Sequence, residues 1–193
     1  MTIKIVAAML AAVVLLPGTV LGQDGGELLS HSRQAATALT RQLAAQLKAE
    51  LGNGEPEAAI RVSRDVAPEI AGRLSRERGW RVARMSLETR NPLLGMPDAW
   101  EQAVLADFDR LAAAGQKHKA LEHAEVVEGP SGRYYRYMKA IPVQPLCLAC
   151  HGSRAAIAPG VAAALRADYP HDQATGEVVD QIRGAVTIKQ PLP

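Results

Sequence analysis

The sequence predicts an α+β domain in which helices precede an antiparallel sheet. Apolar residues recur every four or seven positions between residues 28 and 51, which is the spacing of one face of a helix. Residues 80–87 and 182–189 alternate between two faces, as strands do. The segments LEHAEVVE and RYYRYMKAI flank a short Gly-Pro-Ser-Gly turn, and this arrangement indicates a hairpin of antiparallel strands.

Two helices are expected at the N-terminal side of the domain. The first covers residues 28–51 and stops at Gly52-Asn53-Gly54, because glycine favours the backbone conformation that ends a helix. The second covers residues 56–77 and is expected to bend or break before Pro68, which lacks the N–H that a helix interior needs. Gly79 ends it.

The remaining elements follow in chain order. After the strand at 80–87, the Pro- and Gly-containing segment 88–97 predicts a loop. Asp98 is a good N-cap for a helix over residues 99–114, which Gly115 closes. The hairpin comes next, then a short alanine-rich helix at 159–168 and the final strand at 182–189.

The first 22 residues have the layout of a secretory signal peptide. Lys4 precedes an uncharged apolar run from residue 5 to 16, and small residues near Gly22 suit a signal peptidase. An uncleaved anchor is the alternative, although the run is shorter than the roughly 20 residues of a membrane span. We therefore expect a signal peptide at 1–22, a single domain at 23–193, a periplasmic location, and no stable membrane span after cleavage.

Charge and composition narrow the function classes. The formal charge is +2 for the 193 residues and falls to +1 when Lys4 is removed with the leader, so nothing favours binding to nucleic acid. The chain has only two Trp, four Tyr and one Phe. A large apolar cofactor would supply some of the missing core volume, but a core rich in alanine and leucine explains the composition equally well.

Both cysteines of the chain lie in the segment LCLACHG, residues 146–152. A structural zinc site needs four ligands, and this single pair has no partner pair or pair of histidines. A thioredoxin-like pair belongs to a βαβ unit, which this hairpin context does not provide. A disulfide across two residues is strained and leaves His151 without a role.

Covalent haem attachment uses every residue of the segment. C-x-x-C-H is the signature of c-type haem: two thiols bind the vinyl groups and the histidine binds the iron. We therefore predict one covalent haem c per chain, bound by Cys147 and Cys150, with His151 as the metal ligand. Haem is attached to exported chains, in agreement with the predicted leader.

Four longer stretches carry a resemblance to a known family. They are AAIRVSRDVAPEIAGRLSRERGW, RMSLETRNPLLGMPDAWE, YYRYMKAIPVQPLCLACHG and YPHDQATGEVVDQIRGAVTI, in that order. Over residues 30–190 the chain resembles the PAS-like c-type haem domain family, catalogued as a domain of unknown function in exported bacterial and cyanobacterial proteins. The resemblance implies a PAS-like antiparallel sheet with N-terminal helices and one covalently bound haem.

The sixth iron ligand stays open at this point. Where the family pattern has a cysteine, this chain has Ser63, and a neutral hydroxyl is a poor iron ligand. The other candidates are methionines and histidines, for which core filler or a solvated surface position is the better explanation: Met85, Met96, Met138, His118 and His123. The last alternative is an open site that binds nitric oxide, carbon monoxide or oxygen.

Cations near the motif could pair with the haem propionates, or could be ordinary solvated charges. The candidates are Arg90, Arg133, Arg136 and Lys139. Three tyrosines in the same strand, Tyr134, Tyr135 and Tyr137, could pack on the porphyrin or only on the sheet.

These observations favour a haem-based redox or gas sensor, whose partner is a diatomic gas or a redox protein. A periplasmic electron-transfer cytochrome with a six-coordinate haem is the alternative. A haem enzyme is less favoured, because the sequence has no evident histidine–arginine pair to act as acid and base over the iron.

Overall fold

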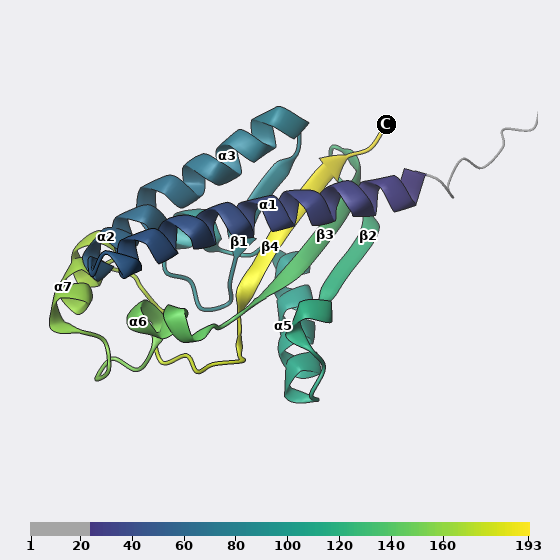
Figure 1. The fold of residues 1–193 in the computed structure, drawn as a ribbon. Coiled ribbons are helices and arrows are strands. Elements are labelled where there is room, and N and C mark those ends of the chain that lie inside the picture. The colour runs from purple at the N-terminus through teal and green to yellow at the C-terminus, as the bar shows by residue number, and fades with distance from the viewer. Residues whose placement is uncertain (1–23) are drawn as a thin grey trace, which may run out of the picture.

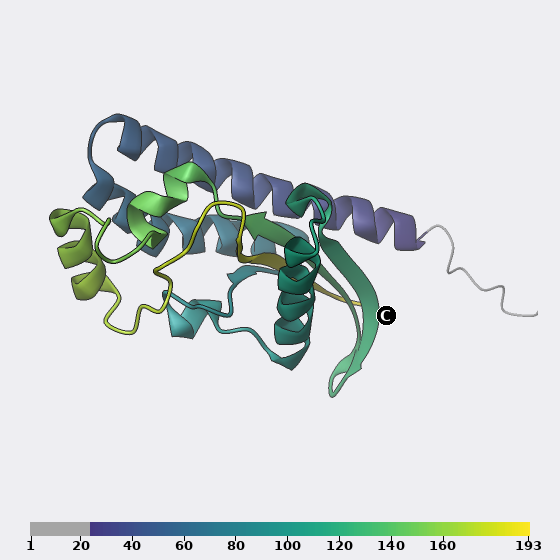
Figure 2. The same ribbon diagram turned by 90° about the horizontal axis from the view of Figure 1, so that it is seen from below.

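A computed structural model describes residues 24–193, so the predicted leader at 1–22 lies outside the described residues. The fold is a four-stranded antiparallel sheet with strand order β1-β4-β3-β2 and helices on both faces. Figure 1 shows α1 and α3 across one face of the sheet, and Figure 2 shows α5 on the other. The α+β class, the antiparallel sheet and the N-terminal helices are confirmed.

Helix α1 (Asp24–Gly52) packs its predicted apolar stripe on the sheet. Ala35, Leu39 and Leu43 in the middle of the stripe are buried, whereas Leu28 and Leu47 near its ends are partly buried. The helix begins four residues earlier than predicted, and it ends at Gly52 as expected. The chain then turns through Gly54, whose φ of 78° is left-handed.

The second predicted helix is interrupted where Pro68 requires it. Helix α2 (Pro56–Arg61) passes into a π-helical turn, η1 (Val62–Val66), before α3 (Ala67–Arg78). The N–H of Ala67 donates to the carbonyl of Val62, five residues earlier, which widens the turn just before Pro68. Gly79 ends α3 with φ 71° and ψ 22°.

Strand β1 (Arg81–Met85) is shorter than the predicted 80–87, because Ser86 leaves the sheet and donates its N–H to the carbonyl of Gly95. The segment predicted as loop contains one short helix, α4 (Pro92–Gly95), whose first turn is capped by the side chain of Asn91. Helix α5 (Ala99–Ala113) begins with a capping box formed by Asp98 and Glu101, and confirms the predicted helix.

The hairpin is also confirmed. Strand β2 (Glu122–Gly129) pairs with β3 (Gly132–Pro142), and Gly129 lies opposite Gly132 at the turn. A 3-10 turn, η2 (His118–Ala120), precedes β2. Strand β4 (Ile182–Pro191) extends two residues beyond its predicted end and lies between β1 and β3. The last strand of the chain is therefore central in the sheet.

The two faces of the sheet carry separate cores. On the α1 and α3 face, Tyr135, Tyr137, Val186 and Ile188 pack against Leu39 and its neighbours. On the α5 face, Met85, Met138 and Ala185 pack against Leu105 and Phe108. Alternate residues of β3 and β4 face opposite layers, as the pleat of a strand requires.

The segment between β3 and β4 lies beyond one end of the sheet, beside α2 (Figure 1). It holds a 3-10 turn, η3 (Pro145–Cys147), and two helices, α6 (Leu148–His151) and α7 (Pro159–Asp168). Helix α7 confirms the predicted helix. Within residues 24–193, no helix combines the length and apolar character that a membrane crossing requires.

Candidate functional site

The C-x-x-C-H segment folds into a compact helical turn. Pro145 begins η3, and the N–H of Gln144 donates to the sulfur of Cys147 at 3.3 Å. Cys150 and His151 follow on α6. Because residues three apart lie on one face of a helix, the two thiols belong to the same side of this turn. Both are free and partly exposed.

The ring of His151 is oriented by a backbone carbonyl. Its Nδ1 lies 2.8 Å from the carbonyl oxygen of Ala174, and an oxygen can only accept, so Nδ1 carries the proton. Burial, and then the positive charges of Arg183 and Arg90, lower the pKa of His151 to about 2. The imidazole is therefore neutral, and the lone pair that a metal ion needs is on Nε2.

Arg90 joins the segments around this histidine. Its Nη2 donates to the carbonyl of Cys150 at 2.6 Å and to that of Ala174 at 3.0 Å. Its Nε donates to Asp172 at 3.1 Å, and both of these side chains are 10% exposed. One guanidinium thus fixes the position of both the motif and the carbonyl that orients His151.

A second arginine, Arg183, lies near Nε2 of His151, as Arg90 also does. Nε of Arg183 is 3.4 Å from Nε2 of His151 and 3.3 Å from the carboxylate of Glu177. Burial raises the pKa of Glu177 to about 7, although the charge of Arg183 acts in the opposite direction. The Oε2 atom of Glu177 is buried without a hydrogen-bond partner in the described part of the chain.

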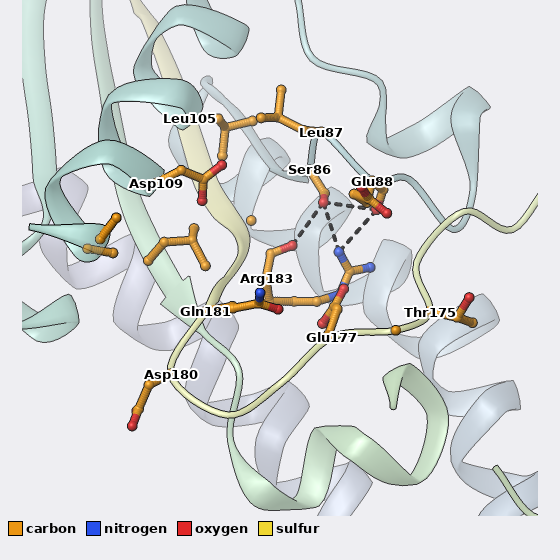
Figure 3. Close-up of a pocket in the computed structure, with 15 residues that line it drawn as sticks. Ser86, Leu87, Glu88, Leu105, Asp109, Thr175, Glu177, Asp180, Gln181 and Arg183 are labelled. Carbon is orange, nitrogen blue, oxygen red and sulfur yellow. Dashed lines mark hydrogen bonds and ion pairs between the residues drawn. The ribbon is translucent and has the colours of Figure 1, made fainter. Parts of the chain in front are cut away.

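Arg183 and Glu177 also line a cleft of about 500 Å³ between α5 and the start of β4 (Figure 3). In Figure 3, Arg183 reaches from β4 towards Ser86, whose hydroxyl lies 2.8 Å from its Nη1. Leu105 and Asp109 of α5 form the opposite wall. The volume is typical of small-molecule or side-chain binding sites in proteins.

A family model described as Tll0287-like matches residues 26–191, which is nearly the whole described chain. The chain belongs to the Tll0287-like family. A similar solved structure is that of the cyanobacterial haem protein Tll0287, with 25% sequence identity and a TM-score of 0.59. The similarity covers 89% of this chain and 97% of that chain. No curated protein matches the sequence significantly.

In this Tll0287-like chain, the candidates for a sixth ligand are dispersed. Met85 and Met138 are buried in the core on the α5 face, so the core-filler interpretation applies to both. Met96 is 59% exposed. His118 is half-buried on η2, and His123 is exposed beside Glu125 and Trp100.

Ser63, which stands where the resemblance implies a cysteine, lies on the π-helical turn η1 and is half-buried. π-Turns inside α-helices occur frequently at functional sites. Ile60, one turn earlier, belongs to the apolar cluster against which Cys150 packs. Ser63 therefore lies on a specialised turn, next to a helix whose Ile60 shares an apolar cluster with Cys150 of the C-x-x-C-H motif.

Three of the four candidate propionate partners are engaged away from the motif. Arg133 pairs with Glu128, and Lys139 contacts the carbonyl of Lys119. Arg136 is buried against Asp98 and Glu101 and lies over the ring of Trp100. Only Arg90 reaches the candidate site.

The tyrosines of β3 pack on the sheet and α1. The hydroxyl of Tyr137 donates to Glu122, Tyr135 belongs to the core beneath α1, and Tyr134 lies under Lys189. Of the two alternatives for this trio, the structure supports packing on the sheet.

Sequence analysis missed four residues that surround His151: Asp172, Ala174, Glu177 and Arg183. They lie 21 to 32 residues after the histidine, in the last of the four stretches that carry the family resemblance. No fixed spacing links them to the motif. Their place in a stretch that carries the family resemblance was the one available signal.

Proposed function

We propose that this Tll0287-like chain is an exported protein that binds one haem c, tethered by Cys147 and Cys150, with Nε2 of His151 as the iron ligand. The observation that carries the proposal is the hydrogen bond from Nδ1 of His151 to Ala174. Histidines that bind metals usually donate their other ring N–H in this way, which fixes the tautomer and the ring orientation.

The residues around the motif fit such a group. Cys150 packs against an apolar cluster of Ile60, Ile157, Val161, Leu165 and Tyr169, a suitable surrounding for a porphyrin. Arg90 and Arg183 supply positive charge next to His151, and guanidinium pairs well with carboxylates. Each free thiol can add S–H across a vinyl double bond, which forms a C–S bond without change of redox state.

A bound haem would supply redox and gas-binding chemistry, and the chain would control access to its iron. Met85 and Met138 are buried in the core on the α5 face, and the other candidate donors are exposed or half-buried: Met96, His118 and His123. Ser63 stands where the family resemblance implies a cysteine. These placements support an open or weakly held sixth site. We therefore favour haem-based redox or gas sensing, in the periplasm.

Electron transfer is the second candidate, and one observation favours it. Met96 is 59% exposed and belongs to the same loop as Arg90, which contacts His151. A methionine ligand would raise the reduction potential, as in electron carriers.

The test is the visible spectrum of protein exported together with the haem-attachment machinery, in oxidised, reduced and carbon-monoxide-treated states. We expect a covalent haem whose reduced bands shift strongly with carbon monoxide. Reduced bands that ignore carbon monoxide would support the electron carrier instead. The double variant Cys147→Ser and Cys150→Ser should show no haem after denaturing electrophoresis, and full retention would refute covalent attachment.

A further inference from the structure

The loop of residues 86–97 exposes large apolar side chains to solvent. The exposed fractions are 44% for Leu87, 94% for Leu93, 54% for Leu94 and 59% for Met96. We call these four residues the apolar loop surface. Scattered exposed leucines are normal on proteins, but four large exposed apolar side chains within ten residues of one loop are a concentration that is typical of an interaction site.

The loop is held in place by internal bonds. The N–H of Ser86 donates to the carbonyl of Gly95 at 3.2 Å, and Asn91 caps α4 by accepting from Leu93 at 3.1 Å. The carbonyl of the buried Thr89 accepts from Gln173 at 2.9 Å. A loop with this many fixed contacts loses little conformational entropy when a partner binds.

Leu87 also lines the cleft described above, so the apolar loop surface continues into it. The described lining residues include four carboxylates, Glu88, Asp109, Glu177 and Asp180, and one cation, Arg183. Glu177 compensates Arg183 at 3.3 Å. The cleft therefore combines an apolar wall with excess negative charge, as Figure 3 shows for Leu87, Leu105 and Asp109.

The other wall of the cleft is equally preorganised. It comes from residues 175–184, which also expose Val178 and Val179 by 56% and 40%. Asp180 has φ 71°, the only non-glycine residue with positive φ among residues 24–193. Its N–H donates to the carbonyl of Val143 at 3.1 Å, which holds this unfavourable conformation.

We propose that the apolar loop surface and the acidic cleft form one docking site for a separate protein that presents lysine or arginine side chains around an apolar centre. The inference rests on the proposed function, because a haem protein that senses or carries electrons passes a signal or electrons to a partner. A basic side chain has the right form for the cleft: its aliphatic stem packs on Leu87 and Leu105, and its charge meets Glu88 and Asp109.

The apolar loop surface favours a protein over a small cation. Leu93, Leu94 and Met96 do not line the cleft, so a small ligand held there would leave them in water. A protein surface covers both regions at once. The position also suits communication with the haem, because Arg90 belongs to this loop and reaches within 3.4 Å of Nε2 of His151.

The test titrates the haem-loaded protein with a small basic monohaem cytochrome whose haem edge is ringed by lysines, at low and physiological ionic strength. We expect binding that weakens with salt. The double variant Leu93→Ser and Leu94→Ser should lose at least tenfold in affinity, and Glu88→Gln with Asp109→Asn should lose both affinity and salt dependence. The controls are Val126→Ser, an apolar residue on β2 that is 46% exposed, and the exposed pair Glu55→Gln with Glu69→Gln.

Absence of binding, equal losses in the control variants, or binding of spermidine in the cleft without any binding of the cytochrome would overturn the proposal. Haem content and absorption spectrum are recorded for each variant. A chain that carries no covalent haem contradicts the proposed function, whereas a normal haem spectrum with unaltered docking contradicts only the docking site.

Discussion

Nδ1 of His151 donates to the carbonyl of Ala174, 23 residues further along the chain, at 2.8 Å. The acceptor lies in the irregular segment between α7 and β4, which Arg90 fixes from the other side through the same carbonyl. The orientation of the proposed iron ligand therefore depends on three segments that are separate in sequence. Each prediction below tests one part of this arrangement or of the fold that supports it.

Replacing Arg90 by lysine should lower the free energy of unfolding by about 2 kcal/mol. The single ammonium group of lysine cannot make all the hydrogen bonds that the guanidinium donates to Cys150, Ala174 and Asp172. Denaturant unfolding of the haem-loaded protein measures this loss. The control is Arg110→Lys, whose exposed pair with Asp107 contributes little. Equal stability of the two variants would show that Arg90 does not organise the site.

Ser63→Cys should change the coordination of the haem. A thiolate on the π-turn would supply the soft donor that the family resemblance implies at this position and would occupy the sixth site, so the spectral response to carbon monoxide should fall sharply. Ser63→Ala serves as the control and should keep the full response, since the hydroxyl is not expected to bind iron. If both variants respond like the wild type, η1 does not face the iron.

Glu101 is fully buried and binds Arg81, Arg136 and Thr187 at 2.8 to 3.1 Å. Glu101→Gln removes the buried one of the two carboxylate charges that compensate Arg136 and leaves only the partly exposed Asp98, so we expect a loss of about 3 kcal/mol in the free energy of unfolding. The haem spectrum should not change, because the cluster lies at the start of α5. The exposed Glu128→Gln is the comparison and should stay within about 0.5 kcal/mol of the wild type.

Glu122 should make the folding stability of the protein decrease at acidic pH. The hydrogen bond from Arg33 lowers the pKa of Glu122 from its usual 4.5, with a further contribution from Tyr137. The unfolded state then binds more protons than the folded state below pH 4.5, so this stabilisation is complete above that pH and is lost as the pH falls. Glu122→Gln should reduce stability at neutral pH by about 1 kcal/mol and flatten its decline in acid.

The measurement for Glu122 is the free energy of unfolding between pH 3 and pH 7 for both proteins. If the two curves run parallel over this pH range, the ion pair between Arg33 of α1 and Glu122 of β2 makes no pH-dependent contribution to stability. Glu69→Gln, an exposed glutamate on α3, should leave the curve unchanged.

Much of the fold could be predicted because its signals are local. The four- and seven-residue spacing in α1, the capping box of α5, the turn between β2 and β3 and the position of Pro68 each act within a few residues. The short helix α4 was missed, since one turn leaves no periodicity to detect. The end of β1 was misplaced because Ser86 bonds to Gly95, a contact that strand alternation does not report.

The sequence by itself determined the chemistry of the candidate site: two thiols and an imidazole at the spacing that is typical of haem attachment. Only the tertiary structure decided which residues surround that imidazole. Pairing of β4 between β1 and β3 brings Arg183 to His151, and the loop before α5 brings Arg90 to Cys150. Such neighbours are selected by packing and long-range strand pairing, whose energies depend on the folded chain as a whole rather than on spacing along it.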